Sequence, residues 1–234
     1  MNDKILGILG GMGPQATQVF YQWILDNTAA ECDQDHVQAV ILSDTGMPDR
    51  TAAILSGHED EVFERLLKDA RSLEACGASH IAIPCNTSHY FARRLQENIT
   101  ATLINMPQLT VEKVAAKGIK KVAILATTGT IKTGVYANEC KAAGIEAYAP
   151  DEDTQELVMD LIYGQIKKGE KGSRHTFEKI DAAVRAAGCD AAILGCTELS
   201  VYRQYHGLPD YYVDAMEVLT HACITTMGRK LRTV

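Results

Sequence analysis

Residues 4–14, KILGILGGMGP, hold the pattern that decides the fold. An apolar run of strand length ends in a glycine-rich turn, and Pro14 then suits the first turn of a helix that we expect to continue to about Asn27. A strand, a glycine-rich turn and a helix in this order are typical of parallel sheets, because a parallel strand pair needs a long crossover connection that is usually helical.

The same pattern recurs along the rest of the chain. Further apolar runs of strand length occupy residues 38–43, 80–84, 102–105, 121–126, 145–149 and 190–194. Apolar positions at helical spacing predict helices over 59–76, 153–168, 174–187 and 214–230, with others beginning near Ser88 and ending near Gly144. We therefore predict an α/β fold of mainly parallel sheets, each covered by helices on both faces.

The two halves of the sequence resemble each other in two respects. A strand leads into a turn rich in Gly or Thr at residues 10–13 and again at 127–130. A later strand leads into a cysteine and two polar residues at 85–87 and again at 196–198. This repetition predicts two pseudo-symmetric lobes.

We place the lobe boundaries near residues 102 and 210. Residues 1–102 and 210–234 would form an N-terminal lobe that carries Cys85, and residues 103–209 would form a C-terminal lobe that carries Cys196. Open α/β sheets bind their ligands at the carboxyl ends of the strands. We therefore expect both cysteines to line one active-site cleft between the lobes.

Composition narrows the class of protein. With 46% hydrophobic residues, 23% charged residues and a formal net charge of −7, the 234-residue chain has the composition of a globular enzyme or small-molecule binder. We expect no nucleic-acid partner, because phosphate binding rests on clustered Lys and Arg. No secretory signal or membrane-spanning stretch is evident. The seven cysteines lack metal-ligand spacing, which favours reduced thiols in the cytoplasm and no bound metal.

A pair of thiols at matching strand ends suits the inversion of a stereocentre by proton transfer. Such inversion needs a base on one face of the carbon and an acid on the other. A free thiol has a pKa near 8.5, so a modest shift makes a thiolate available at neutral pH. Cys85 and Cys196 could therefore act as a thiolate and thiol pair, whereas we interpret Cys76, Cys140, Cys189 and Cys223 as packing residues.

Four motifs carry a resemblance to a known family. They are Gly10-Gly-Met-Gly-Pro14, Pro48-Asp-Arg-Thr51, Pro84-Cys-Asn-Thr-Ser-His89 and Gly195-Cys-Thr-Glu-Leu199. In order and over nearly the whole chain, they resemble the aspartate/glutamate racemase superfamily, and its aspartate racemase branch in particular. The resemblance implies a two-lobed enzyme, often a homodimer, that uses no pyridoxal phosphate or other cofactor. It also implies that Cys196 deprotonates the L-enantiomer and Cys85 the D-enantiomer.

The resemblance also implies a set of substrate contacts. Arg50 would hold a substrate carboxylate with its planar guanidinium, and Lys167 or the adjacent Lys168 would hold the distal carboxylate. Asn86, Thr87 and Thr197 would bind the α-carboxylate, partly through backbone N–H groups. The full set of expected substrate-binding residues is Met12, Arg50, Asn86, Thr87, Ser88, Thr127, Thr130, Lys167, Thr197 and Glu198. Thr127 and Thr130 have a second interpretation, as caps of the following helix.

Two departures from the superfamily pattern bear on the substrate. Glutamate racemases typically carry an Asp-Ser pair after the first strand and a His after the second Cys-Thr. This chain has Gly10-Gly11 and Glu198 at those places. We therefore expect an acidic amino acid as substrate, aspartate before glutamate, although the sequence leaves the choice open because one carbon changes binding by only about 1–3 kcal/mol.

Other interpretations compete with racemisation of aspartate. Gly11-Met-Gly13-Pro-Gln-Ala16 fits a relaxed dinucleotide-binding pattern and would suit an oxidoreductase, but no acidic residue follows at the usual spacing. Cys85 and His89 could form the dyad of a thiol hydrolase if both lie on one helix, but we favour a capping or packing role for His89. Hydantoin racemases, maleate isomerases and arylmalonate decarboxylases share the two-lobed scaffold, and a non-catalytic solute-binding protein is a further alternative.

Overall fold

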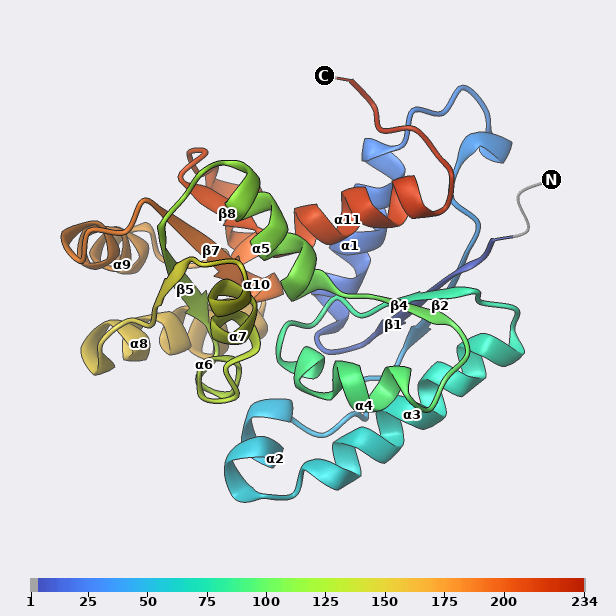
Figure 1. The fold of residues 1–234 in the computed structure, drawn as a ribbon, viewed down its shortest axis with the longest axis horizontal. Coiled ribbons are helices and arrows are strands. Elements are labelled where there is room, and N and C mark those ends of the chain that lie inside the picture. The colour runs from blue at the N-terminus through green and yellow to red at the C-terminus, as the bar shows by residue number, and fades with distance from the viewer. Residues whose placement is uncertain (1–3, 234) are drawn as a thin grey trace. The chain divides into compact units, whose positions relative to one another are not determined.

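The computed structural model describes residues 4–233, which divide into two compact units. The first unit comprises the described residues up to Met106 and those from Met216 onward, and the second comprises Pro107–Ala215. Each unit is built on a four-stranded parallel sheet covered by helices (Figure 1). The predicted α/β class with mainly parallel sheets is confirmed.

The sheet of the first unit has the strand order β2-β1-β3-β4. Its strands are β1 (Leu6–Gly10), β2 (Ala39–Ser43), β3 (His80–Ala82) and β4 (Thr102–Ile104). Every residue of β1 is buried, because this strand has a partner on each side and helices on both faces. The strand β2 is only partly buried, with Ile41 42% exposed, because it lies at the edge of the sheet and has a partner strand on one side only.

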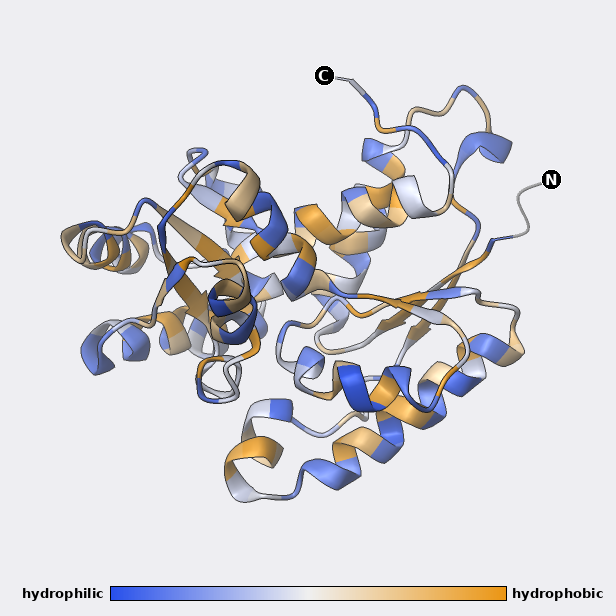
Figure 2. Ribbon diagram, in the orientation of Figure 1, coloured by the Kyte–Doolittle hydropathy of each residue, from blue (hydrophilic) through white to orange (hydrophobic). Residues whose placement is uncertain are grey.

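Helices α1 (Pro14–Asn27) and α11 (Ala215–Thr226) cover one face of this sheet, and α3 (Glu59–Ala75) and α4 (Ala92–Gln96) cover the other (Figure 1). The short helix α2 (Arg50–Ser56) precedes α3. Apolar side chains of α3, including Val62, Leu66 and Leu73, pack in the core beneath the sheet. Figure 2 shows the resulting division, with hydrophobic strands and helices that carry hydrophilic residues on their outer sides.

The sheet of the second unit repeats the topology, with the order β6-β5-β7-β8. Its strands are β5 (Lys121–Ala126), β6 (Glu146–Tyr148), β7 (Ala191–Gly195) and β8 (Tyr212–Asp214). The first strand of each unit is central, the second lies at one edge and the third lies on the other side of the first. Strands β3 and β7 are therefore topologically equivalent, as are β1 and β5.

Six helices accompany this second sheet: α5 (Met106–Ala116), α6 (Thr128–Lys132), α7 (Val135–Ala142), α8 (Glu152–Met159), α9 (Arg174–Ala186) and α10 (Thr197–His206). The single helix expected over 153–168 is in fact three segments, because α8 is followed by a π-helical turn, Asp160–Gln165, and a 3-10 turn, Ile166–Lys168. The backbone leaves helical geometry at Gln165, with φ −122° and ψ −72°, just before the last segment with its two lysines.

Residues 210–215 lie in the second unit, whereas the sequence-based boundary assigned them to the first lobe. The reason is β8, a three-residue strand that was not predicted and that pairs with β7 through Tyr212, Val213 and Asp214. Helices α2, α5 and α10 were also not predicted. Within residues 4–233, no helix is long and apolar enough to cross a membrane.

Candidate active site

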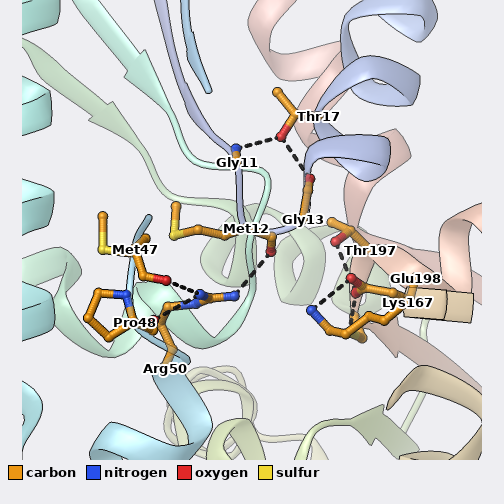
Figure 3. Close-up of polar contacts among 11 residues, drawn as sticks. Gly11, Met12, Gly13, Thr17, Met47, Pro48, Arg50, Lys167, Thr197 and Glu198 are labelled. Atoms are coloured by element: carbon orange, nitrogen blue, oxygen red, sulfur yellow. Dashed lines mark hydrogen bonds and ion pairs between the residues drawn. The ribbon is translucent and has the colours of Figure 1, made fainter. Parts of the chain in front are cut away.

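The glycine-rich turn after β1 packs against Thr17 of α1 and against the backbone of Asp44. Thr17 on α1 accepts a hydrogen bond from the Gly11 N–H at 2.9 Å and donates one to the Gly13 carbonyl at 3.0 Å (Figure 3). A Cβ at Gly10 would collide with the Thr17 side chain, and one at Gly11 would collide with the Asp44 backbone. Gly11 also has a φ of +91°, which favours glycine. The turn is thus fixed by close backbone approach.

Arg50 is the first residue of α2 and is held against this turn. The Asp49 side chain caps the helix by accepting from the Ala52 N–H at 2.8 Å. The Arg50 guanidinium donates to the Pro48 carbonyl at 2.9 Å and to the Met12 carbonyl at 3.4 Å, and the residue is only 8% exposed (Figure 3). A buried guanidinium fixed by backbone carbonyls is a preorganised cation at the carboxyl end of the sheet.

Cys85 follows β3 and is buried, with 6% of its surface exposed. The His89 ring holds its backbone: Nδ1 lies 2.9 Å from the Cys85 carbonyl oxygen, and the Met106 N–H donates to Nε2 at 3.3 Å. Because Nε2 accepts a hydrogen bond, Nδ1 carries the proton and donates it to the carbonyl. Burial lowers the pKa of His89 to about 4, so the ring is neutral near pH 7.

The residues after Cys85 are buried as well. Asn86, Thr87 and Ser88 are at most 6% exposed and lead into a short 3-10 segment, Thr87–Phe91. The Ser88 hydroxyl donates to the Met12 sulfur at 3.4 Å, which joins the loop after β3 to the loop after β1. The first unit therefore brings Met12, Arg50, Cys85 and Ser88 together at the carboxyl ends of neighbouring strands.

Cys196 in the second unit directly follows β7 and stands at the N-cap of α10. Its backbone is extended there, with φ −146° and ψ 134°. The thiol, only 7% exposed, donates to Oε2 of Glu198 at 2.9 Å. The predicted site residue Glu198 thus contacts the predicted catalytic cysteine directly.

The Glu198 carboxylate also interacts with the side chains of Lys167 and Thr197 (Figure 3). Lys167 Nζ lies 3.1 Å from Oε1, and the Thr197 hydroxyl lies 3.4 Å from Oε2. Burial raises the pKa of the Cys196 thiol well above its usual range, the Glu198 charge adds to that rise, and Lys167 opposes it. The ion pair with Glu198 is made by Lys167, so of the two adjacent lysines it is Lys167 that lies in the cluster.

Thr127 and Thr130 lie after β5, at the place equivalent to the glycine-rich turn of the first unit. Thr127 is the N-cap of α6, and its hydroxyl accepts from the Thr130 N–H at 3.3 Å. The two hydroxyls are 3.2 Å apart, and both residues are buried. The capping interpretation of this pair therefore has direct geometric support, whereas their contact with substrate stays a prediction.

The family model described as Asp/Glu/Hydantoin racemase matches residues 9–223, a span that includes both cysteines. The chain belongs to this family.

Individual members of the Asp/Glu/hydantoin racemase family match the chain over nearly its whole length. The aspartate racemase of Picrophilus torridus is 31% identical, with a TM-score of 0.82 over 98% of this chain and 96% of its own. The broad-specificity amino-acid racemase RacX of Bacillus subtilis is 26% identical over 95% of this chain and 97% of its own. A putative Asp/Glu racemase of Yersinia pestis, 23% identical with a TM-score of 0.80, shares the fold.

The geometry of this family member weighs against two of the competing interpretations. The glycines of the supposed dinucleotide pattern approach Thr17 and Asp44, so their backbone is in contact with the chain itself. Asp44 follows β2, where a dinucleotide-binding protein would need an acidic residue to bind ribose. Its carboxylate instead forms an ion pair with Arg65 and accepts a hydrogen bond from the Gly46 N–H. His89 directs both ring nitrogens at backbone groups, which does not match the base of a thiol hydrolase.

Two contacts of the site were not predicted from the sequence. A capping or packing role for His89 was the favoured interpretation, and the structure gives its form as a hydrogen bond with the Cys85 carbonyl. Glu198 was predicted to contact substrate, and its contacts with Cys196 and Lys167 were not foreseen. The spacing of Cys85 and His89, four residues apart, could have suggested the first contact, but nothing in the sequence links residue 167 to residue 198.

Proposed function

We propose that this protein racemises an acidic amino acid, aspartate before glutamate, by two-base proton transfer between Cys85 and Cys196 without a cofactor. The observation that carries the proposal is the equivalence of the two cysteines. Each is buried and follows the third strand of a four-stranded parallel sheet, β3 in one unit and β7 in the other. Carboxyl ends of such strands are where α/β sheets bind their ligands.

The reaction would proceed by exchange of protons at one carbon. The thiolate of one cysteine removes the Cα proton, forming an S–H bond, while the thiol of the other cysteine delivers its proton to the opposite face. The two residues then have exchanged their protonation states, and the reverse direction uses them in opposite roles. A carbon about 3–3.5 Å from each sulfur would be correctly placed for both transfers.

The charges of the site suit an acidic substrate. Abstraction at Cα builds negative charge next to a carboxylate, so fixed cations and N–H donors lower the barrier. We assign Arg50 to a substrate carboxylate, since its guanidinium is buried and already oriented by the Met12 and Pro48 carbonyls. Asn86, Thr87 and Thr197, each adjacent to or one residue removed from a cysteine, would contact the α-carboxylate.

A broader substrate range is the second candidate. The Bacillus subtilis relative is described as a broad-specificity amino-acid racemase, whereas the Picrophilus torridus relative is an aspartate racemase. Both match nearly the whole chain. An enzyme specific for acidic amino acids would prefer acidic side chains, whereas a broad-specificity racemase would not. We expect any such preference to depend on Arg50.

The experiment is incubation of the purified protein with each enantiomer of aspartate, glutamate and alanine in deuterated water, with no cofactor added. For aspartate we expect optical rotation to be lost and deuterium to be incorporated at Cα. For alanine we expect both changes to be slower or absent. Equal rates for alanine and aspartate would favour the broad-specificity candidate. Failure to exchange Cα hydrogen in any amino acid would contradict racemisation altogether.

A further inference from the structure

The closed cluster around the second cysteine points to a step that the paired thiols alone do not explain. Cys196 Sγ donates to Glu198 Oε2 at 2.9 Å, and Lys167 Nζ lies 3.1 Å from Oε1 of the same carboxylate. The Cys196 and Glu198 residues are 7% and 5% exposed. The thiol proton is therefore directed at a buried carboxylate.

We propose that Glu198 is the proton acceptor of Cys196. The S–H bond of Cys196 breaks as an O–H bond forms at Oε2, which leaves a thiolate beside the Lys167 ammonium and a neutral carboxylic acid. This inference rests on the proposed function, because it supplies the base form of Cys196 that two-base racemisation needs. When the Cys196 thiolate later takes a proton from the substrate carbon, it becomes a thiol again, and Glu198 keeps its own proton until solvent removes it, which restores the starting cluster.

The charge of the cluster makes this transfer favourable compared with loss of the proton to water. Before the step, a neutral thiol, a carboxylate and an ammonium sum to zero; after it, a thiolate, a carboxylic acid and an ammonium also sum to zero. Loss of the thiol proton to solvent would instead leave two buried anions against one cation. Burial of uncompensated charge is costly, so the proton stays within the cluster.

The groups that surround the cluster fit the same assignment. The Thr197 hydroxyl donates to Glu198, and the Tyr163 ring lies 5.0 Å from Lys167 Nζ, where its face stabilises the ammonium. Tyr136, whose pKa burial raises, interacts electrostatically with Cys196 and stays neutral. On the first turn of α10, the acidic residue is Glu198 itself.

This assignment changes the role of two residues first expected to contact substrate. A carboxylate such as Glu198 would repel an acidic substrate, whereas as a proton acceptor for Cys196 it has a chemical use. Lys167 serves as counter-ion to whichever group of the pair is ionised. Its position at the end of the π-helical turn Asp160–Gln165, against α10, is what brings the ammonium to the carboxylate.

The test compares Glu198→Gln with Glu156→Gln, which removes a carboxylate from an exposed position on α8 of the same unit. Two quantities are measured: racemisation of aspartate, and the pH at which the Cys196 thiolate forms. The second comes from the ultraviolet absorbance of the thiolate, as the difference between each protein and the same protein with Cys196→Ser. It does not depend on turnover.

For Glu198→Gln we expect kcat to fall by about 100-fold or more, with a smaller change in KM, because a general acid–base contribution is lost. We also expect the Cys196 thiolate to form at lower pH, since Lys167 then faces the sulfur without a competing carboxylate. Glu156→Gln should change neither quantity. A Glu198→Gln protein with the kcat and the thiolate titration of Glu156→Gln would overturn the proposal.

Lys167→Met is the second variant, which covers the case in which Glu198→Gln does not fold. Lys167 is partly exposed, with a side chain 23% accessible, so its replacement is tolerated more easily. Without the ammonium the thiolate should form at higher pH, opposite to Glu198→Gln, and an unchanged titration would overturn the proposal. If the parent protein racemises no amino acid, the proposed function fails, and the two titrations still show whether Glu198 and Lys167 act on the Cys196 thiol in opposite directions.

Discussion

The imidazole of His89 and the carbonyl oxygen of Cys85 are joined by a hydrogen bond of 2.9 Å, and the other ring nitrogen accepts from the Met106 N–H at 3.3 Å. The ring thus fixes the backbone of one cysteine and does not touch its sulfur. His89 is a positioning residue, and its neutral state is part of that role.

Replacement of His89 should therefore disturb Cys85 through its backbone. In His89→Phe, the Cys85 carbonyl and the Met106 N–H lose their partner, and a buried polar group left unpaired costs about 1–3 kcal/mol. We expect that loss of stability in denaturant unfolding, with kcat reduced by more than KM is raised. The exposed His175→Phe serves as control. Parental kcat in His89→Phe would contradict the positioning role.

The buried ring also predicts how stability depends on pH. Burial lowers the pKa of His89 to about 4 from the ordinary 6.5, so the unfolded chain binds more protons than the folded chain between these values. Stability from this group is complete above pH 6.5 and is lost as pH falls through 4, by about 3 kcal/mol at about 1.4 kcal/mol per pKa unit. The unfolding free energy of His89→Gln should fall less steeply than that of the parent over this window, and equal slopes would count against the assignment.

Gly11→Ala should destabilise the first unit more than the same change at another glycine of positive φ. At Gly11, with φ +91°, the added Cβ would collide with the Asp44 backbone, whereas at Gly57, with φ +74°, nothing lies within 4 Å. Strained backbone of this kind costs about 1–3 kcal/mol, and the collision adds to it. Thermal unfolding of both variants checks this, and equal losses would show that close approach to Asp44 does not matter.

Arg50→Lys should weaken use of acidic substrates while it preserves the charge. A lysine lacks the planar donor set with which the guanidinium can hold the Met12 and Pro48 carbonyls and a carboxylate at once. We expect kcat/KM for aspartate to fall by about 10–100-fold, since a charge-assisted hydrogen bond contributes about 1.5–3 kcal/mol. Arg93→Lys, at an exposed position on α4, is the matched control. An unchanged preference for aspartate over alanine in Arg50→Lys would remove Arg50 from the substrate site.

Much of this fold could be predicted from the sequence because its central strands are continuous apolar runs. β5 coincides with its predicted run, β1 and β7 each end one residue beyond theirs, and the cysteines lie after β3 and β7 as expected. β8 was missed because one of its three residues is Asp214, which leaves only Tyr212 and Val213 as an apolar signal. The single helix expected over 153–168 was wrong because helical periodicity does not reveal an interruption such as the π-helical turn at Asp160–Gln165.

The contacts within the site were harder to predict than its residues. Residues two apart on a helix do not face each other, so Cys196 and Glu198 would not be expected to bond. They do so because Cys196 stands outside the helix in extended conformation, which turns its thiol toward the first turn of α10. Lys167 reaches the same carboxylate from 31 positions away in the chain, through a turn whose shape depends on tertiary packing.

The racemisation rates of Cys85→Ala and Cys196→Ala, measured with both enantiomers of aspartate in deuterated water, test the paired-thiol account most directly. The account predicts that each single variant loses interconversion in both directions by about 100-fold or more, while the exposed Cys76→Ala racemises like the parent and gives product with deuterium at Cα. Interconversion at the parental rate in either Cys85→Ala or Cys196→Ala would contradict it.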